Sequence, residues 1–490
     1  MSRKLDSILL GSYDAETVRL ELIQGAYYHC SQNLDDSGKR DPSLPLMEDT
    51  LAFVHEIMHW YQDVGTLLGI AFHYFHDSPV HIIQNISKLL SEQYSKHKIT
   101  LPLYPVTKPI ERNIELADLI SHAALYNILW DVLDGEKVMY EHHAAEVFAC
   151  VGDDAEDPQA AFNYWLIMSK RLKAKSEKLN RQEQSSPIGP SNKPIGCLAL
   201  QEGQARAIEE MSAILAELNG TPISDNFKIL DPNRWAGKYR IARDYMRNIL
   251  CWKNFPDMTK EELFYRLYAF SAICDLAMAT PISPRFFRSW AENYSWKDYH
   301  PGWRFHKLCH AMKFLNIDLR SMEVEDYNKF VSELTGVLGW RDANEIYSTG
   351  TQINNDSILE ELSKRFFHIR SKHPNIMINP LITATLGEQG FTELLLAIPP
   401  PLCGLPGNYR SKIKGDELLF CIDPPLRIKG LSIDNSYLLQ ELLKCEKYGS
   451  NLAHQIIWTG KKPKSVPQAF LEIDPIMLVT GLSEDSFEWQ

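Results

Sequence analysis

The sequence predicts a mainly α-helical protein with a small β-sheet (α+β), and three observations lead to this fold class. Amphipathic segments with apolar residues at helical spacing recur along most of the 490 residues. Segments rich in β-formers are confined to residues 16–28 near the start and to residues 417–422 and 427–433 near the end. No internal repeat or coiled-coil heptad pattern organises the chain. We therefore expect helices to build the core.

The composition is that of a globular protein, with 44% hydrophobic and 23% charged residues. The net charge of -12 disfavours a protein that coats nucleic acid or an anionic membrane, because those surfaces attract basic domains. We find no apolar run of about 18 residues that could span a membrane, and no signal peptide. The nine cysteines are scattered and include no Cys-x-x-Cys pair. We therefore expect a cytoplasmic protein without nucleic-acid or membrane partners.

The first strand or hairpin is expected over residues 16–28, where apolar and polar side chains alternate. Residues 31–45 are polar and contain glycine and prolines, which predicts a loop. From residue 47 the period becomes helical, and a helix is expected over residues 47–69. Its apolar stripe consists of Met47, Leu51, Val54, Met58 and Tyr61.

Beside that stripe, His55, Glu56 and His59 form a His-Glu-x-x-His pattern. Histidines four residues apart share one face of a helix and can bind one zinc ion, and Glu56 can reach a metal-bound water as a general base. The offset of both histidines from the stripe favours a site over a buried pair that bonds to carbonyl groups. A catalytic zinc needs a third protein ligand and an open position for water.

The following region is mostly amphipathic, with the clearest helices expected over residues 110–135, 138–150 and 158–179. Residues 185–194 contain three prolines and predict a loop. A strongly helical segment then begins at Cys197 and contains Glu202. Further helices are expected over residues 234–250, 260–278, 284–294, 302–315, 324–338 and 358–371.

The two motifs together resemble the glutamate-zincin (gluzincin) metallopeptidases. In that family a helix with His-Glu-x-x-His is followed by a helix that carries a third-ligand glutamate, often as Glu-Gly-x-Ala. The matching positions are His55, Glu56 and His59, followed by Glu202, Gly203 and Ala205. The resemblance implies a zincin-like catalytic core with one zinc ion per chain, ligands His55, His59 and Glu202, and Glu56 as the base.

The resemblance covers residues 47–69 and 196–212, and the chain departs from the family pattern twice. The stretch between His59 and Glu202 is long, which implies a large helical insertion. Arg206 stands where some members carry a carboxylate that orients a zinc histidine, a role that Glu209 or Asp63 could take instead.

Other candidates remain open for the third ligand and for a donor to the oxyanion. Glu202 could be an ordinary exposed helix glutamate, and His142 with Glu146 provides a fallback at i, i+4 spacing. Tyr299 and His300 could stabilise an oxyanion, although a plain helix entry is the simpler interpretation.

The predicted organisation has three parts. Residues 1–250 form the catalytic core, with the insertion at 70–195. Residues 251–340 form a helical subdomain that completes the cleft, and residues 341–490 form a C-terminal α+β region for substrate or partner recognition.

The predicted function is that of a zinc metallopeptidase acting on a protein or peptide substrate, with a regulatory protein partner as a further hypothesis. One alternative is a catalytically silent zincin-like binding or scaffold protein. A remote alternative is a carboxylate di-iron protein, because Glu56 and His59 form a Glu-x-x-His step. Such sites need the step twice, and the sequence contains it once.

Overall fold

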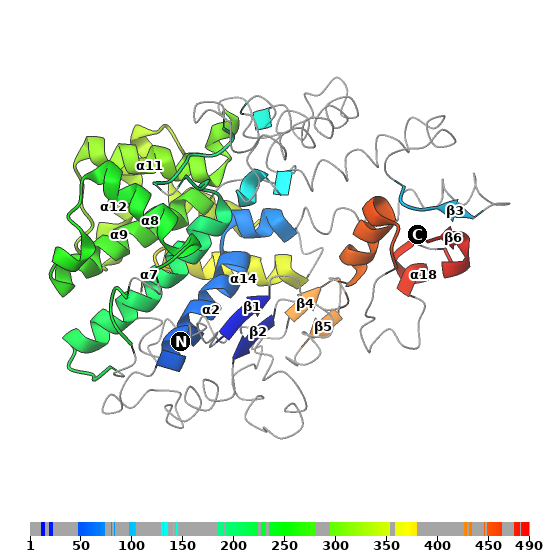
Figure 1. The fold of residues 1–490 in the computed structure, drawn as a ribbon, viewed down its shortest axis with the longest axis horizontal. Helices are drawn as coiled ribbons and strands as arrows, with labels where there is room; N and C mark the ends of the chain where they lie inside the picture. Colours follow the sequence, from blue (N-terminus) through cyan, green and yellow to red (C-terminus); the bar gives the residue numbers. More distant parts are fainter. Residues whose placement is uncertain are drawn as a thin grey trace, which may run out of the picture. The chain divides into compact units, whose positions relative to one another are not determined.

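The computed structural model is mainly helical, with three pairs of short strands among the residues that it describes (Figure 1). This architecture confirms the predicted fold class. The larger described stretches, apart from short internal gaps, are residues 48–73, 184–279, 295–379, 445–462 and 475–489. Shorter described pieces include residues 11–14, 19–22, 98–103, 129–130, 132–135, 426–428 and 431–433.

The chain forms two compact units, each assembled from segments that are not consecutive. The first unit contains residues 1–70, 189–280 and 301–440, and the second contains residues 71–188, 281–300 and 441–490. The three-part division expected from the sequence stays a prediction. The expected helices at 158–179 and 284–294 and the expected strand at 417–422 lie outside the described residues.

Helices make up most of the described part of the first unit. They are α2 (Glu48–Gly65), α7 (Cys197–Leu218), α8 (Lys238–Leu250), α9 (Lys260–Met278), α11 (Pro301–Leu315), α12 (Val324–Val337), α13 (Ala343–Gly350) and α14 (Ile358–Lys372). Strands β1 (Gly11–Asp14) and β2 (Arg19–Leu22) form an antiparallel pair that contacts α2. Strands β4 (Leu426–Ile428) and β5 (Leu431–Ile433) form a second antiparallel pair.

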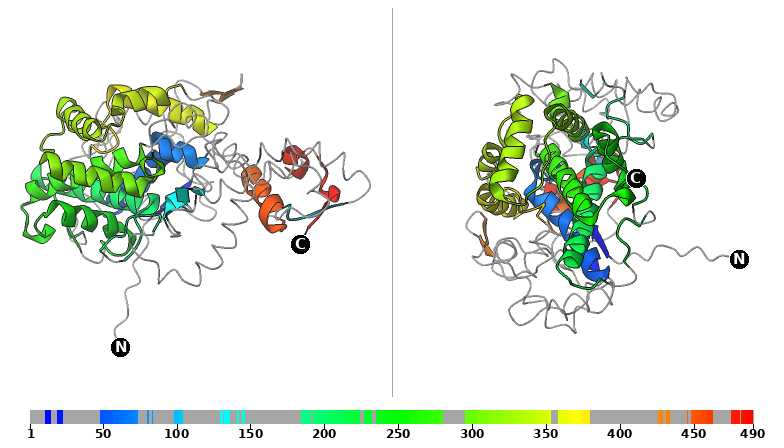
Figure 2. Two further views of the ribbon diagram at one scale, coloured as in Figure 1. Left: turned by 90° about the horizontal axis from the view of Figure 1, so that it is seen from above. Right: turned by 90° about the vertical axis from the view of Figure 1, so that its left-hand side faces the viewer.

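Helix α7 is the central element of this unit, packing against α2 on one side and against α8 and α9 on the other (Figures 1 and 2). Its buried surface includes many small side chains, which let the neighbouring helices approach closely. At Gly203 an added Cβ would lie 3.1 Å from the ring of Phe270 in α9 and 3.4 Å from the main-chain oxygen of Tyr239 in α8. Gly203 therefore serves the contact of α7 with α8 and α9.

Helix α2 ends where Thr66 interrupts the helical hydrogen bonding. The Thr66 hydroxyl donates to the main-chain oxygen of Gln62 at 2.6 Å and accepts from the main-chain nitrogen of Gly69 at 2.9 Å. Helical residues 67–73 follow. An added Cβ at Gly69 would lie 2.2 Å from the main-chain oxygen of Asp63, so this tight junction requires glycine.

A buried arginine holds the C-terminal end of α2. The Arg370 guanidinium, on α14, donates to the main-chain oxygen of Gly65, to the carboxylate of Asp275 in α9 and to the hydroxyl of Tyr347 in α13. Arg370 and Asp275 are each 1% exposed. A positive charge at the carbonyl end of a helix also complements the helix dipole. This cluster ties α2 to three other helices.

The second unit contains a two-stranded parallel pair, β3 (Ile99–Thr100) with β6 (Phe487–Glu488). Its other named elements are the 3₁₀ helix η5 (Trp296–Asp298), the π-helical segment η8 (Gln455–Thr459), helix α18 (Pro475–Thr480) and the 3₁₀ helix η10 (Glu484–Ser486). The main-chain nitrogen of Leu103 donates to the main-chain oxygen of Ile456 at 3.0 Å. In the described part of the chain, no helix combines the length and the apolar character needed to cross a membrane.

Candidate metal centre

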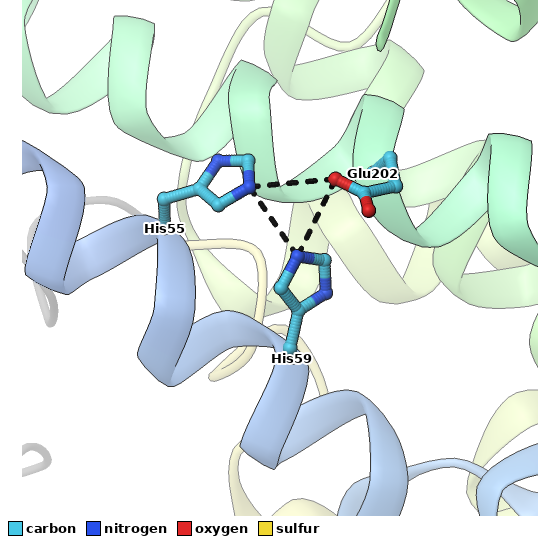
Figure 3. A group of neighbouring side chains, drawn as sticks. All are labelled: His55, His59 and Glu202. Atoms are coloured by element: carbon cyan, nitrogen blue, oxygen red, sulfur yellow. Dashed lines mark hydrogen bonds and ion pairs between the residues drawn. The ribbon is translucent and has the colours of Figure 1, made fainter. Parts of the chain in front are cut away.

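Helices α2 and α7 bring His55, His59 and Glu202 together (Figure 3). The two histidines lie one turn apart on α2, and both rings point toward the Glu202 carboxylate on α7. The two Nε2 atoms are 3.3 Å apart. Glu202 Oε2 lies 3.5 Å from His55 Nε2 and 3.6 Å from His59 Nε2. The three donor atoms therefore form a nearly equilateral triangle.

This triangle has the dimensions of a metal site. Two ligands of a tetrahedral ion with bonds of about 2.0–2.1 Å lie about 3.3–3.4 Å apart, and the three measured separations run from 3.3 to 3.6 Å. His55 and Glu202 are each only 7% exposed, and His59 is partly buried. The group can thus hold a metal ion. Glu202, the third residue that the sequence suggested, is a member of this group, and its role as a zinc ligand stays a prediction.

A carboxylate faces the far side of the His55 ring. Glu209 Oε2 lies 3.4 Å from His55 Nδ1, and Glu209 is itself held by the guanidinium of Arg206, one turn earlier on α7. Arg206 also donates to Glu210 at 2.9 Å, and Glu210 accepts from the main-chain nitrogen of Leu230 at 3.0 Å. Arg206, a departure from the family pattern, thus fixes one of the two carboxylates expected to orient a histidine. The orienting role of Asp63, which is buried on α2, stays a prediction.

An amide takes the corresponding place at His59. Gln62 Oε1 lies 2.9 Å from His59 Nδ1, with Gln62 three residues further along α2. Sequence reasoning did not identify this partner of His59. The i, i+3 spacing was the signal that could have identified it.

Two further residues at the site come from the start of α8. The ammonium of Lys238 pairs with Glu202 Oε1, the oxygen turned away from the histidines. The ring of Tyr239 meets the ring of His55 edge-on, with centroids 5.7 Å apart. Burial, with the negative charges of Glu202 and Glu56, raises the pKa of Tyr239 to about 12. Its hydroxyl therefore remains a neutral hydrogen-bond donor at neutral pH.

The carboxylates make this site attractive to positive charge. Burial opposes protonation of His55, but Glu202 and Glu209 outweigh it and raise the pKa of His55 to about 9. For Glu202, burial disfavours the carboxylate, yet its interactions with His55 and His59 outweigh burial and lower its pKa below the ordinary value. In the metal-free protein, a proton on His55 therefore takes the place of a metal ion at neutral pH.

This competition predicts the pH dependence of metal binding. Below pH 9 the proton on His55 must leave before Nε2 can bind a metal ion. The apparent affinity for Zn²⁺ should therefore rise by about tenfold per pH unit from pH 7 and level off near pH 9, with about one proton released per ion. Calorimetric titrations in buffers of different ionisation enthalpy measure both quantities. An affinity that stays constant from pH 7 to pH 9 would contradict this assignment.

The other residues considered from the sequence have different outcomes. Glu56 lies between the histidines on α2 with its side chain partly exposed, and it is not one of the three donors. His142 and Glu146 lie outside the described residues.

His300 belongs to the second unit and is fully buried, with Nε2 3.0 Å from the Val132 main-chain oxygen and 3.1 Å from Ser186 Oγ. Burial lowers its pKa to about 4. It has the contacts of a core histidine, and Tyr299 beside it is also buried.

Comparison of the chain with protein-family models, with curated proteins and with solved structures gives no match. Function must therefore be inferred from the chemistry of the site.

Proposed function

We propose that the protein is a zinc metallopeptidase of the gluzincin type that hydrolyses peptide bonds in a protein or peptide substrate. The observation that carries this proposal is the triangle of His55 Nε2, His59 Nε2 and Glu202 Oε2, with separations that suit a tetrahedral ion. Two histidines and one glutamate are a ligand set that catalytic zinc sites use, with the fourth position open to water.

A zinc ion bound there would polarise the scissile carbonyl group and make its bound water more acidic. Glu56 accepts a proton from the attacking water and delivers it to the leaving nitrogen. Its place beside His55 supports this role, since its negative charge, after those of Glu202 and Glu209, also raises the pKa of His55. Tyr239, a neutral phenol next to His55, is the candidate donor to the oxyanion.

The two alternatives have less support. A carboxylate di-iron site needs two Glu-x-x-His steps, and among the described residues one group of three donors meets the requirements of a metal site. A silent scaffold would not require a base beside the ligands, yet Glu56 is present. A cleavage experiment decides between a scaffold and a peptidase.

The full chain, loaded with Zn²⁺, should generate new peptide termini in a cell lysate, detected by mass spectrometry. Removal of zinc with a chelator should abolish them, and added Zn²⁺ should restore them, whereas Mg²⁺ should not. Absence of new termini with zinc bound would favour the scaffold alternative. Termini that persist after zinc removal would exclude this mechanism.

A further inference from the structure

Behind the His59 ring, two glutamines form a continuous chain of hydrogen bonds through three helices. Gln62 on α2 and Gln204 on α7 are both fully buried. Gln62 Nε2 donates to the Gln201 main-chain oxygen at 3.0 Å and to Gln204 Oε1 at 2.9 Å. Gln204 Nε2 donates to the Ser271 main-chain oxygen in α9 at 2.9 Å. Two buried amides in one line are costly unless each group is bonded, and this chain satisfies them.

The direction of every bond in this chain is fixed from its far end. Main-chain oxygens only accept hydrogen bonds, so the amide nitrogen of Gln204 must face Ser271 and that of Gln62 must face Gln201. Gln204 Oε1 then accepts from Gln62, and Gln62 Oε1 is left facing His59. An amide oxygen also only accepts. The proton of the His59 ring must therefore reside on Nδ1, which leaves the lone pair of a neutral ring on Nε2.

We propose that Gln62 and Gln204 are positioning residues that hold His59 in the tautomer and orientation required for metal binding, with the main chain of α9 as the anchor. The inference rests on the proposed metal site, though not on its proteolytic activity. Because His59 Nδ1 donates to Gln62, the lone pair on His59 Nε2 points toward the other two donor atoms, His55 Nε2 and Glu202 Oε2.

The two histidines are thus held by different chemistry. His55 is backed by the charged carboxylate of Glu209, and His59 is backed by the uncharged amide of Gln62. A neutral partner orients the ring without adding a second negative charge next to the ligands. A bound ion would therefore keep more of its positive charge, which favours its action as a Lewis acid.

Zinc affinity of the full chain, measured by competition with a chromophoric chelator, tests the proposal. Gln62→Met removes the acceptor at His59 and should weaken zinc binding by about 10- to 100-fold. Gln204→Met should weaken it by less, because Gln62 keeps its bond to the Gln201 main chain. The exposed control Gln352→Met should match the wild type.

Gln62→Glu separates positioning from packing. Its carboxylate can still accept from His59 Nδ1, so zinc affinity should stay within about threefold of the wild type or increase. The same variant should unfold at a lower temperature, because oxygen atoms would then face the oxygens of Gln201 and Gln204. Equal zinc affinity of Gln62→Met and the wild type would overturn the proposal. Equal losses of affinity in Gln62→Met and Gln62→Glu would also overturn it, because that is the result of a purely structural role.

If Gln62→Met does not fold, the wild type itself provides the test. In zinc-loaded protein labelled with ¹⁵N-histidine, the Nδ1 proton of His59 should exchange slowly with solvent, and fast exchange would overturn the proposal.

The outcomes of these experiments also distinguish a failure of this inference from a failure of the proposed function. Zinc binding without peptide cleavage would exclude the proposed peptidase function but not the positioning role of Gln62 and Gln204. A wild type that binds no zinc would exclude both proposals.

Discussion

The Glu56→Gln variant should bind zinc as tightly as the wild type and hydrolyse peptides about 10²- to 10⁴-fold more slowly, a loss expressed in kcat. Glutamine has the same shape as glutamate but cannot accept a proton. The Glu56 side chain is partly exposed and contributes none of the three donor atoms, so its replacement should disturb neither the fold nor the ligands. The loss should therefore appear in the chemical step alone.

Zinc content and kcat, measured on the same preparation, separate this effect from metal loss. Glu202→Gln should lose zinc and activity together, because Glu202 Oε2 lies 3.5 and 3.6 Å from the two histidine nitrogens. Glu261, an exposed residue in the first turn of α9, offers a matched control, and Glu261→Gln should have the zinc content and kcat of the wild type. A Glu56→Gln variant with zinc bound and an unchanged rate would remove Glu56 from the mechanism.

Helix α2 could be predicted from the sequence because its apolar stripe and its His-Glu-x-x-His motif both lie within one short segment. Helical periodicity predicted a stripe of five apolar side chains: Met47, Leu51, Val54, Met58 and Tyr61. Met47 lies outside the described residues, and the other four side chains are buried. The same spacing placed His55 beside His59. The helix is nevertheless buried more widely than the stripe indicates, and Trp60 on another face is fully buried. Packing of α2 between α7, α14 and β1 explains this difference.

Contacts between distant segments could not be predicted from the pattern of any one helix. Glu202 was found only through the resemblance of its motif, because no periodicity within α7 shows that it meets α2. The ion pair of Glu202 with Lys238 depends on the approach of α8, and the bond of Gln204 to Ser271 depends on the approach of α9. The short helix α13 was also missed. One of its residues, Tyr347, is fully buried against the pair of Arg370 and Asp275.

Breaking the buried ion pair of Arg370 and Asp275 should have the largest effect on stability. Arg370→Met should lower the free energy of unfolding by about 3–5 kcal/mol, because it leaves the charge of Asp275 buried without its cation. The hydroxyls of Tyr347 and Tyr327 lie 2.9 and 3.5 Å from the Asp275 carboxylate, but neither supplies a charge. The change also removes the donor to the main-chain oxygen of Gly65, so the C-terminal end of α2 should become more mobile.

Urea unfolding of the metal-free full chain, followed by circular dichroism, measures the loss without a contribution from bound zinc. Lys372→Met, an exposed substitution on the same helix, should remain within about 0.5 kcal/mol of the wild type. Arg370→Met combined with Asp275→Leu should recover part of the loss, because it removes both buried charges. Recovery would identify the unpaired carboxylate as the main cost. A double variant no more stable than Arg370→Met would instead assign the cost to the lost bond at Gly65, and hence to the anchoring of α2.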